Sequence, residues 1–152
     1  MWKVKKFEEL SNREIYEILK LRIDTFVVEQ KRIYHELDKN DLTAFHIFYQ
    51  NEQDFSVQAY SRIFKTDNYI TFGRVVTSQR FRGHGLGKKL LEQILIFCQQ
   101  KWPNEEIIIH AQIQVVDFYK NHGFIQIGKP FEFNLTPHVK MIYKPTNSLK
   151  IN

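Results

Sequence analysis

The sequence is short of the features that mark secreted, metal-binding and membrane proteins. One cysteine, Cys98, stands among 152 residues, so no disulfide can form within the chain and we expect a reducing, cytoplasmic compartment. The six histidines and this cysteine show no H-x-x-x-H or C-x-x-C spacing, which argues against a structural metal. No apolar run approaches the ~20 residues that span a bilayer, and the first residues, MWKVKKFEEL, lack the apolar centre of a signal peptide. We therefore expect a protein without metal or membrane partners.

The composition is that of a globular protein. Hydrophobic residues make up 43% and charged residues 26% of the chain, which excludes an intrinsically disordered protein. There is no internal repeat, low-complexity segment or linker. We expect one domain over residues 1–145, followed by a flexible tail over residues 146–152.

The formal charge is +5 and the sequence pI is about 9.3, which raises the question of a nucleic-acid partner. The cations are spread along the chain, however, and neither a basic helix nor an interleaving of basic and aromatic residues is present. Spread charge is typical of a solvated surface. We interpret the one dense central cluster, in QRFRGHGLGKK, as a local anion site and expect no nucleic-acid binding.

Hydrophobic periodicity predicts ten elements in the order β-α-β-β-β-α-β-α-β-β. Ser11 and Glu14 are spaced as a capping box at a helix start, and Gly123 is placed as a helix C-cap. An antiparallel meander that leads into β-α-β-α-β predicts an α/β (α+β) fold, a mixed sheet with helices on it. The expected strands are residues 2–7, 44–50, 55–64, 69–78, 106–111, 124–128 and 139–144, and the expected helices are residues 11–30, 86–102 and 113–123, with a loop at residues 31–43.

Three glycines and four cations surround the start of the second helix, in SQRFRGHGLGKK. The first amides of a helix have no internal acceptor, and the aligned peptides add partial positive charge there. Glycine lets an oxygen ligand approach the backbone closely. A plain strand-to-helix turn is the alternative, but so many glycines and cations together favour a phosphate site. The dinucleotide pattern G-x-G-x-x-G and the phosphate-loop pattern G-x-x-x-x-G-K-[ST] both fail here.

The segment RFRGHG, residues 80–85, has the R/Q-x-x-G-x-G/A form with which the GNAT superfamily of N-acetyltransferases binds the pyrophosphate of acetyl-CoA. The strand GRVVTS comes directly before it. About 35 residues later, VVDFYKNHGF resembles the family's A-x-x-F-Y-x-x-x-G-F signature, with Val115 in place of alanine. The early LRIDTFVVEQ is similar to the opening of the ElaA-like branch. The resemblance covers residues 1 to about 144.

This resemblance implies a mixed, mostly antiparallel sheet of six to seven strands, with a splayed central pair and flanking helices. It implies an acetyl-CoA-dependent N-acetyltransferase that acts on a primary amine of a small molecule or protein. Coenzyme A would pair with backbone groups of a bulged strand, and the Val76 amide would stabilise the oxyanion. The residues implied to bind the coenzyme are Val75, Val76, Thr77, Arg82, Gly83, His84, Gly85, Leu86, Gly87 and Lys88.

By its motif position Tyr119 is the candidate general acid for the leaving thiolate, although it could simply pack in the core. The base that takes the amine proton is less defined: Glu29 and His46 are candidates, Glu36 and Asp38 lie in or near the same expected region, and a water chain could replace any of them. We also expect Arg22 to form an ion pair with a carboxylate of the cleft. The acids of HELDKND, residues 35–41, either attract a cationic amine or lie on a solvated loop.

Two other functions stay open. A regulatory domain could bind acyl-CoA without turnover. Acyl-homoserine-lactone synthases share an R-x-x-x-F pattern with Arg22 and Phe26, although the chain is short for that role. Either a monomer or a homodimer fits the sequence. Cys98 lies in an apolar helical stretch, and we expect it to be a packed side chain.

Overall fold

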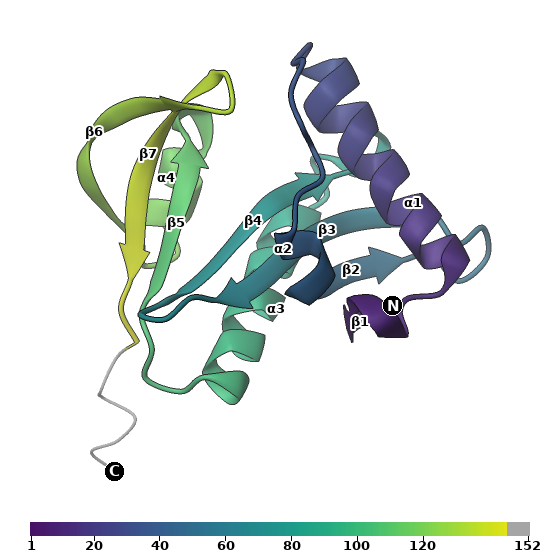
Figure 1. Ribbon diagram of the computed structural model, residues 1–152, viewed down its shortest axis with the longest axis horizontal. Helices are drawn as coiled ribbons and strands as arrows, with labels where there is room; N and C mark the ends of the chain where they lie inside the picture. The colour runs from purple at the N-terminus through teal and green to yellow at the C-terminus, as the bar shows by residue number, and fades with distance from the viewer. Residues whose placement is uncertain (146–152) are drawn as a thin grey trace. The chain divides into compact units, whose positions relative to one another are not determined.

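The computed structural model describes residues 1–145, and the tail expected at residues 146–152 lies outside the described residues. Its strands form one seven-stranded mixed sheet in the order β1-β2-β3-β4-β5-β7-β6, with helices flanking it (Figure 1). The chain divides into two compact units: residues 1–64 with 73–95, and residues 65–72 with the chain from residue 96 on. The expected fold class is confirmed, while the splay of the central strands stays a prediction.

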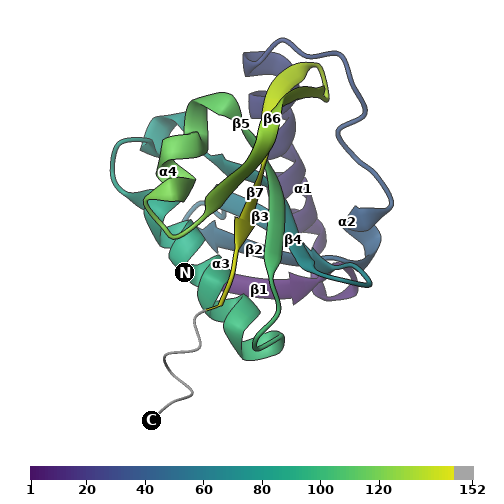
Figure 2. The ribbon, with the colours of Figure 1, turned by 90° about the vertical axis from the view of Figure 1, so that its left-hand side faces the viewer.

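The first unit contains four strands and most of the helices. Strand β1 pairs antiparallel with β2, and β2 pairs antiparallel with β3. Helix α1 and the start of α3 lie on opposite faces of these strands (Figures 1 and 2). The elements that begin in this unit are β1 (Trp2–Lys6), η1 (Phe7–Glu9), α1 (Asn12–Arg22), η2 (Ile23–Glu29), α2 (Asn40–Thr43), β2 (Phe45–Gln50), β3 (Val57–Lys65), η3 (Gln79–Phe81) and α3 (Leu86–Lys101).

Helix α1 begins where the capping box places it. The Glu14 amide donates to the Ser11 hydroxyl at 3.0 Å, and the Ser11 amide donates to the Glu14 carboxylate at 2.9 Å. The expected single helix does not continue to residue 30, because η2 is a seven-residue π-helix. Its wider turns interrupt the α-helical winding. Within η2, Ile23 is 38% exposed, whereas Phe26 is buried at 5%.

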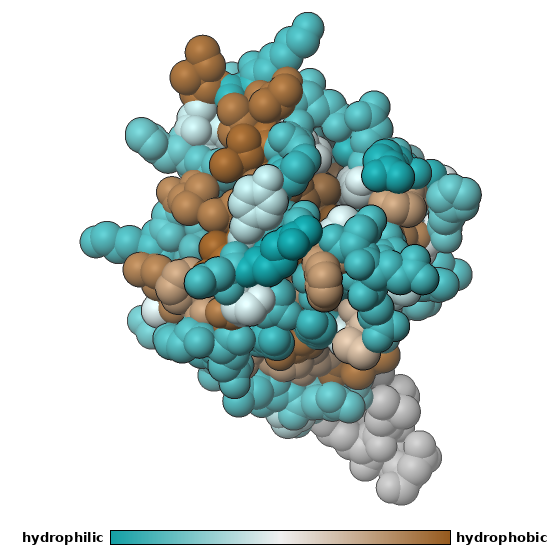
Figure 3. All heavy atoms as spheres, turned by 90° about the vertical axis from the view of Figure 1, so that its right-hand side faces the viewer, coloured by the Kyte–Doolittle hydropathy of each residue, from teal (hydrophilic) through white to brown (hydrophobic). Residues whose placement is uncertain are grey.

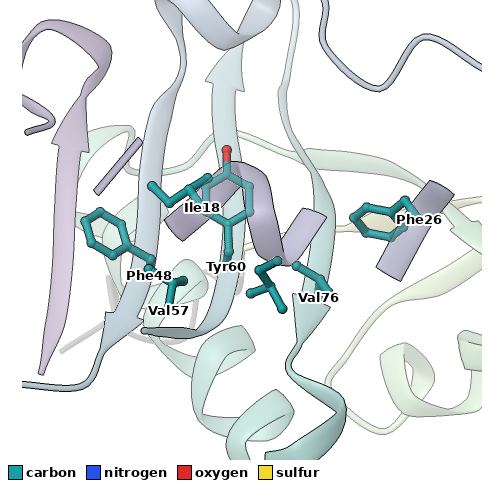
Figure 4. Packing of buried hydrophobic residues seen from close by; sticks show 7 residues of the cluster. Ile18, Phe26, Phe48, Val57, Tyr60 and Val76 are labelled. Atoms are coloured by element: carbon teal, nitrogen blue, oxygen red, sulfur yellow. The ribbon is translucent and has the colours of Figure 1, made fainter. Parts of the chain in front are cut away.

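The core of the first unit packs α1 and η2 against the sheet. Figure 4 shows the aromatic rings and branched side chains of this cluster converging from the helices and from β2, β3 and β4 (Ile70–Thr77). Burying such side chains contributes about 1.5–3 kcal/mol each. Val76 belongs to the cluster at 4% exposure. The buried members are Ile18, Leu21, Phe26, Phe48, Val57, Tyr60 and Val76.

The second unit is built on β5 (Ile107–Gln112), which pairs antiparallel with β7 (Thr136–Tyr143) and in parallel with β4 at Ile70. Strand β6 (Ile125–Phe133) pairs with the other edge of β7. The short elements η4 (Ile113–Val115) and α4 (Val116–Lys120) follow β5, and α4 contacts β6 (Figure 2). Gly123 ends this turn with φ +93, as the C-cap signal predicted.

Two segments differ from expectation. The loop expected at residues 31–43 contains the short helix α2. Strand β6 continues to residue 133, five residues beyond the predicted end, and a tight turn at Asn134 and Leu135 joins it to β7. Both turn residues have positive φ, 50° and 66°, although neither is glycine. This hairpin therefore lacks the glycine that normally signals such a turn.

Cys98 is buried at 3%, and burial raises the pKa of its thiol to about 12, which agrees with the expected packing role. None of the helices in residues 1–145 is long and apolar enough to cross a membrane. Figure 3 faces the side on which α1 lies; hydrophilic side chains cover most of it, with hydrophobic side chains between them.

Candidate functional site

The glycine turn, residues 82–88, joins β4 to α3 and is largely exposed. Gly83 and Gly85 have φ of +87° and +76°, a conformation that other residues adopt only with strain. A Cβ atom at either glycine would meet nothing within 4 Å. The protein's own packing therefore does not require glycine there, and the backbone stays open to a ligand.

Helix α3 starts within this turn. The Lys89 amide donates to the Gly85 carbonyl at 3.1 Å, which places the free amides of the first helical turn at Leu86, Gly87 and Lys88. The amides of Phe81 and Arg82 instead donate to Ser78 and Gln79 at 2.9 and 3.5 Å. The amides that can hold a diphosphate thus begin at Gly83, and the helix start adds partial positive charge.

Arg82 of the glycine turn forms a two-point ion pair with Glu29 at the end of η2. Its Nη1 and Nη2 donate to the Glu29 carboxylate at 2.8 and 3.2 Å, and its Nε donates to the Thr77 carbonyl at 3.3 Å. The hydrogen bond from Arg82 lowers the pKa of Glu29. The pairing therefore disfavours Glu29 as a base, because its carboxylate is already engaged and its proton affinity is reduced.

Strand β4 changes conformation just before the residues expected to hold the coenzyme. Arg74 has φ +53, a left-handed conformation that costs a non-glycine residue about 1–3 kcal/mol. Val75 and Val76 follow directly. Such strain persists only where surrounding contacts fix it, and it concentrates at functional sites.

The contacts that fix it belong to a largely buried set of charged side chains, of which only Asp38 is exposed, called here the arginine–carboxylate cluster. Arg22 is 1% exposed; its Nε donates to Glu36 and its Nη1 to Asp41, both at 2.8 Å. Glu36 lies in the segment between η2 and α2, and Asp41 lies in α2; Figure 1 shows this segment passing beside the strands of the first unit. The cluster consists of Arg22, Arg62, Arg74, Glu36, Asp38 and Asp41.

The expected ion pair of Arg22 is thus present, and arginines of the same chain also pair with the other acids of residues 35–41. Arg62 donates to Asp38 at 2.7 Å and to Asp41 at 3.0 Å. Burial would raise the pKa of Asp41, but the hydrogen bond and charge of Arg22 outweigh it and lower that pKa to about 2. Pairing with arginines of the same chain makes these acids less available to a cationic amine, while Asp38 and its neighbours remain exposed to solvent. The two interpretations of the segment therefore stay predictions.

His46 lies against this cluster at 2% exposure. Its Nε2 is 2.9 Å from the Asp41 carbonyl oxygen and its Nδ1 is 2.7 Å from the Tyr60 hydroxyl. A carbonyl can only accept, so Nε2 carries the proton and Nδ1 accepts from Tyr60. Burial lowers the pKa of His46. With both nitrogens engaged inside the protein, these contacts disfavour His46 as the base for a substrate.

Tyr119 lies on α4 in the second unit and is 5% exposed. Its ring packs against the rings of Phe72, Phe118 and Phe124, with centroids 5.3–6.1 Å apart. Burial raises its pKa, so the phenol keeps its proton throughout the neutral range. In residues 1–145, no group of three or more His, Cys, Asp or Glu side chains is placed to hold a metal ion.

The family model described as Acetyltransferase (GNAT) domain matches residues 8–145. The chain belongs to this family. Protein ElaA of Escherichia coli is 33% identical over 143 residues, which are 92% of this chain and 94% of ElaA. The crystal structure of ElaA matches with a TM-score of 0.89 and covers 95% of this chain and 99% of that chain.

Two more solved structures are similar to this GNAT domain. An acyl-CoA N-acyltransferase from Pseudomonas aeruginosa is 30% identical, with a TM-score of 0.87 over 94% of this chain and 99% of that chain. The AHL synthase LasI has a TM-score of 0.77 at 13% identity over 95% of this chain and 89% of that chain. That last likeness shows a shared fold alone.

The sequence did not reveal that Arg62 and Arg74 pair with the acids of residues 35–41, or that Tyr60 contacts His46. The only signal was a basic residue inside an apolar strand, as in SRIF and GRVV. A charged side chain at such a position is rarely buried unless it is paired, so these arginines could have been matched to the acids of residues 35–41.

Proposed function

We propose that the protein is an acetyl-CoA-dependent N-acetyltransferase that transfers the acetyl group to a primary amine of a small molecule or a protein. The observation that carries the proposal is the exposed glycine turn. It combines positive φ at Gly83 and Gly85, free amides at a helix start and room for a ligand. Membership of the GNAT family and the similarity to an acyl-CoA N-acyltransferase support it. Acetyl-CoA would be the cosubstrate, and the reaction would take place in the cytoplasm.

The proposed reaction is a direct attack of the neutral amine on the thioester carbon. A C–N bond forms, the C–S bond breaks, and the acyl oxygen carries negative charge in between. We assign stabilisation of that charge to the Val76 amide, a contribution of about 3 kcal/mol for one donor. Tyr119 would give its proton to the leaving thiolate, and its raised pKa keeps the phenol protonated for that role.

The coenzyme would be held by Val75, Val76 and Thr77 along β4 and by the turn from Arg82 through Gly83, His84, Gly85, Leu86 and Gly87 to Lys88. The amine must lose a proton before it attacks, because it is almost wholly charged at neutral pH. The contacts of Glu29 and His46 weaken both as bases. We therefore propose that water carries this proton away.

The test combines binding with turnover. A ligand present at about 100 times its Kd stabilises the folded protein by about 2.7 kcal/mol, so acetyl-CoA should raise the melting temperature. Free thiol should then appear when acetyl-CoA is supplied with polyamines, amino acids, aminoglycosides or peptides. A thermal shift without thiol release from any amine would support an acyl-CoA-binding regulatory domain instead. The absence of any shift at millimolar acetyl-CoA would contradict both functions.

A further inference from the structure

Arg74 has a left-handed backbone conformation that interrupts β4 directly before Val75 and Val76. With φ +53 it holds a conformation that is unfavourable for an arginine. Gly73, which could adopt it without strain, stands one position earlier and does not have positive φ. The strained conformation therefore falls on Arg74 and not on Gly73. This indicates that contacts of the Arg74 side chain fix the backbone.

Glu36 makes the closest contacts with the Arg74 side chain, and the Asp38 carboxylate lies further away, 3.8 Å from Nη2. Its Nε donates to the Glu36 carboxylate at 3.0 Å, and its Nη2 donates to the Glu36 carbonyl at 2.8 Å. Only 12% of the Arg74 side chain and 3% of the Glu36 side chain are exposed. Two-point contacts of this kind fix direction as well as distance.

Glu36 is in turn held from two other directions. Arg22 donates to the same carboxylate oxygen at 2.8 Å and to the Glu36 carbonyl at 3.1 Å. The Tyr34 hydroxyl donates to the second carboxylate oxygen, and the Arg74 guanidinium lies over the Tyr34 ring at 5.7 Å. We call these four residues the Arg74 clamp. Since each donor comes from a different part of the first unit, the clamp ties β4 to α1 and to the segment before α2.

Stability alone does not account for this arrangement. Taking charges out of water costs several kcal/mol per ion, and well-packed apolar side chains often serve a core as well or better. The clamp does provide a fixed position at residue 74. The next fixed position is residue 76, whose side chain is anchored in the core cluster (Figure 4). The Val75–Val76 peptide is therefore held on both sides.

We propose that Arg74, held by Glu36, is a positioning residue for acyl transfer, which fixes the backbone so that the Val76 N–H group points at the acyl oxygen. This role rests on the proposed function. Arg74 does not touch the reacting atoms; it acts through the strand. Because one misplaced hydrogen-bond donor reduces turnover strongly, loosening the clamp should reduce turnover more than coenzyme binding.

Arg74→Asn is the main test variant, because asparagine tolerates the left-handed conformation and Glu36 keeps its bond to Arg22. We expect kcat to fall about 10- to 100-fold while the Kd for acetyl-CoA changes less than about threefold. Arg74→Lys keeps the charge but not the two-point contact, so its kcat should lie between those of the wild type and Arg74→Asn. Arg62→Lys is the matched control, a buried arginine of the same cluster on β3, and should lose stability without a comparable loss of kcat.

A second readout does not depend on turnover. In NMR titrations of the wild-type protein, the Val76 amide shift should differ between acetyl-CoA and free coenzyme A, and Arg74→Asn should shrink that difference. If the two ligands shift the Val76 amide differently and Arg74→Asn reduces that difference, but no amine is acetylated, the positioning role of Arg74 is supported and the proposed function is contradicted. The inference is overturned if the Val76 amide does not distinguish the two ligands, if Arg74→Asn keeps wild-type kcat, or if Arg62→Lys lowers kcat equally.

Discussion

Tyr119 and His46 are both buried and both candidates for moving a proton, yet their surroundings differ in kind. Tyr119 packs against the hydrocarbon faces of three phenylalanines, whereas His46 has a partner on each ring nitrogen. A group that is already bonded on both sides must break a bond before it can serve a substrate. At the scale of single residues, Tyr119 is therefore the better candidate for proton transfer.

Tyr119→Phe tests this assignment with the loss of one oxygen atom. We expect turnover to fall about 100-fold, since a positioned acid contributes a factor of this order, while the Kd for acetyl-CoA stays within about twofold. Steady-state kinetics and calorimetric titration would measure the two. Unchanged turnover would exclude Tyr119 as the acid, and a large loss of affinity would give it a structural role.

Arg22→Met should show how strongly the arginine–carboxylate cluster depends on its most buried cation. The substitution leaves Glu36 and Asp41 buried with fewer positive partners, so we expect a loss of about 3–5 kcal/mol in the free energy of unfolding. Lys20→Met on the same helix removes an exposed ion pair with Asp24 and should change the free energy of unfolding little. Urea unfolding measures the free energy of unfolding of both variants. Equal values for the two would contradict the predicted dependence on Arg22.

At the scale of elements, the glycine turn and α3 could be predicted from the sequence because their signals are local. Glycine positions, cations and apolar spacing all lie within residues 78–97. The arginine–carboxylate cluster could not, because its partners are far apart in the chain: Arg22 and Glu36 are separated by 14 residues, and Arg74 and Glu36 by 38. Pairing over such distances depends on the sheet register, which hydrophobic periodicity alone does not fix.

Strand β6 illustrates a second limit. Gly128 has φ +80, and the register with β7 shifts between Ile127 and Phe131. Glycine weakens a strand, and proline is confined to edge strands, strand starts and bulges, so the sequence pattern predicts a strand that ends at residue 128. The hydrogen bonds to β7 resume after the irregularity, and only the tertiary pairing reveals the continuation to residue 133.

Gly87→Ala separates the stability of α3 from its proposed ligand contact. An added Cβ would meet only the Thr77 methyl carbon at 3.9 Å, so we expect the free protein to gain up to about 0.5 kcal/mol from alanine's helix propensity. Affinity for acetyl-CoA should nevertheless fall, because the Cβ would stand where the diphosphate approaches. Thermal unfolding and calorimetric titration measure the two effects.

Gly85→Ala provides the matched comparison. With φ +76 at this position, alanine should destabilise the free protein by about 1 kcal/mol through backbone strain. A Gly87→Ala protein that binds acetyl-CoA as tightly as the wild type would contradict the proposed approach to the turn.

At the scale of the whole molecule, the buried carboxylates predict sensitivity to acid. Asp41 has a pKa of about 2 in the folded protein, compared with about 3.9 in an unfolded chain. The stabilisation from this depressed pKa is complete above the unfolded value and is lost as pH falls toward 2. Glu14, whose pKa is also lowered to about 2 by its bonds to Ser11, Lys3 and Lys5 despite burial, adds in the same direction.

Urea unfolding between pH 7 and pH 2 should therefore show a free energy of unfolding that falls steeply below about pH 4. Asp41 accounts for about 2 kcal/mol of this loss. Asp41→Asn should be less stable than the wild type at pH 7 and lose less on acidification. Parallel pH curves for the two proteins would show that Asp41 is not coupled to folding as its arginine contacts indicate.

The π-helix η2 carries a consequence for how this chain can change length. The amides of a π-helix bond one residue further back than those of an α-helix, so deleting one residue between Ile23 and Glu29 would let the segment take up ordinary helical winding with Glu29 still facing Arg82. An α-helix advances about 100° per residue, so the same deletion within α1 would instead turn Glu29 away from Arg82 by more than a quarter of a revolution. One codon fewer should therefore be tolerated in η2 but not in α1, although neither deletion alters a side chain of this ion pair.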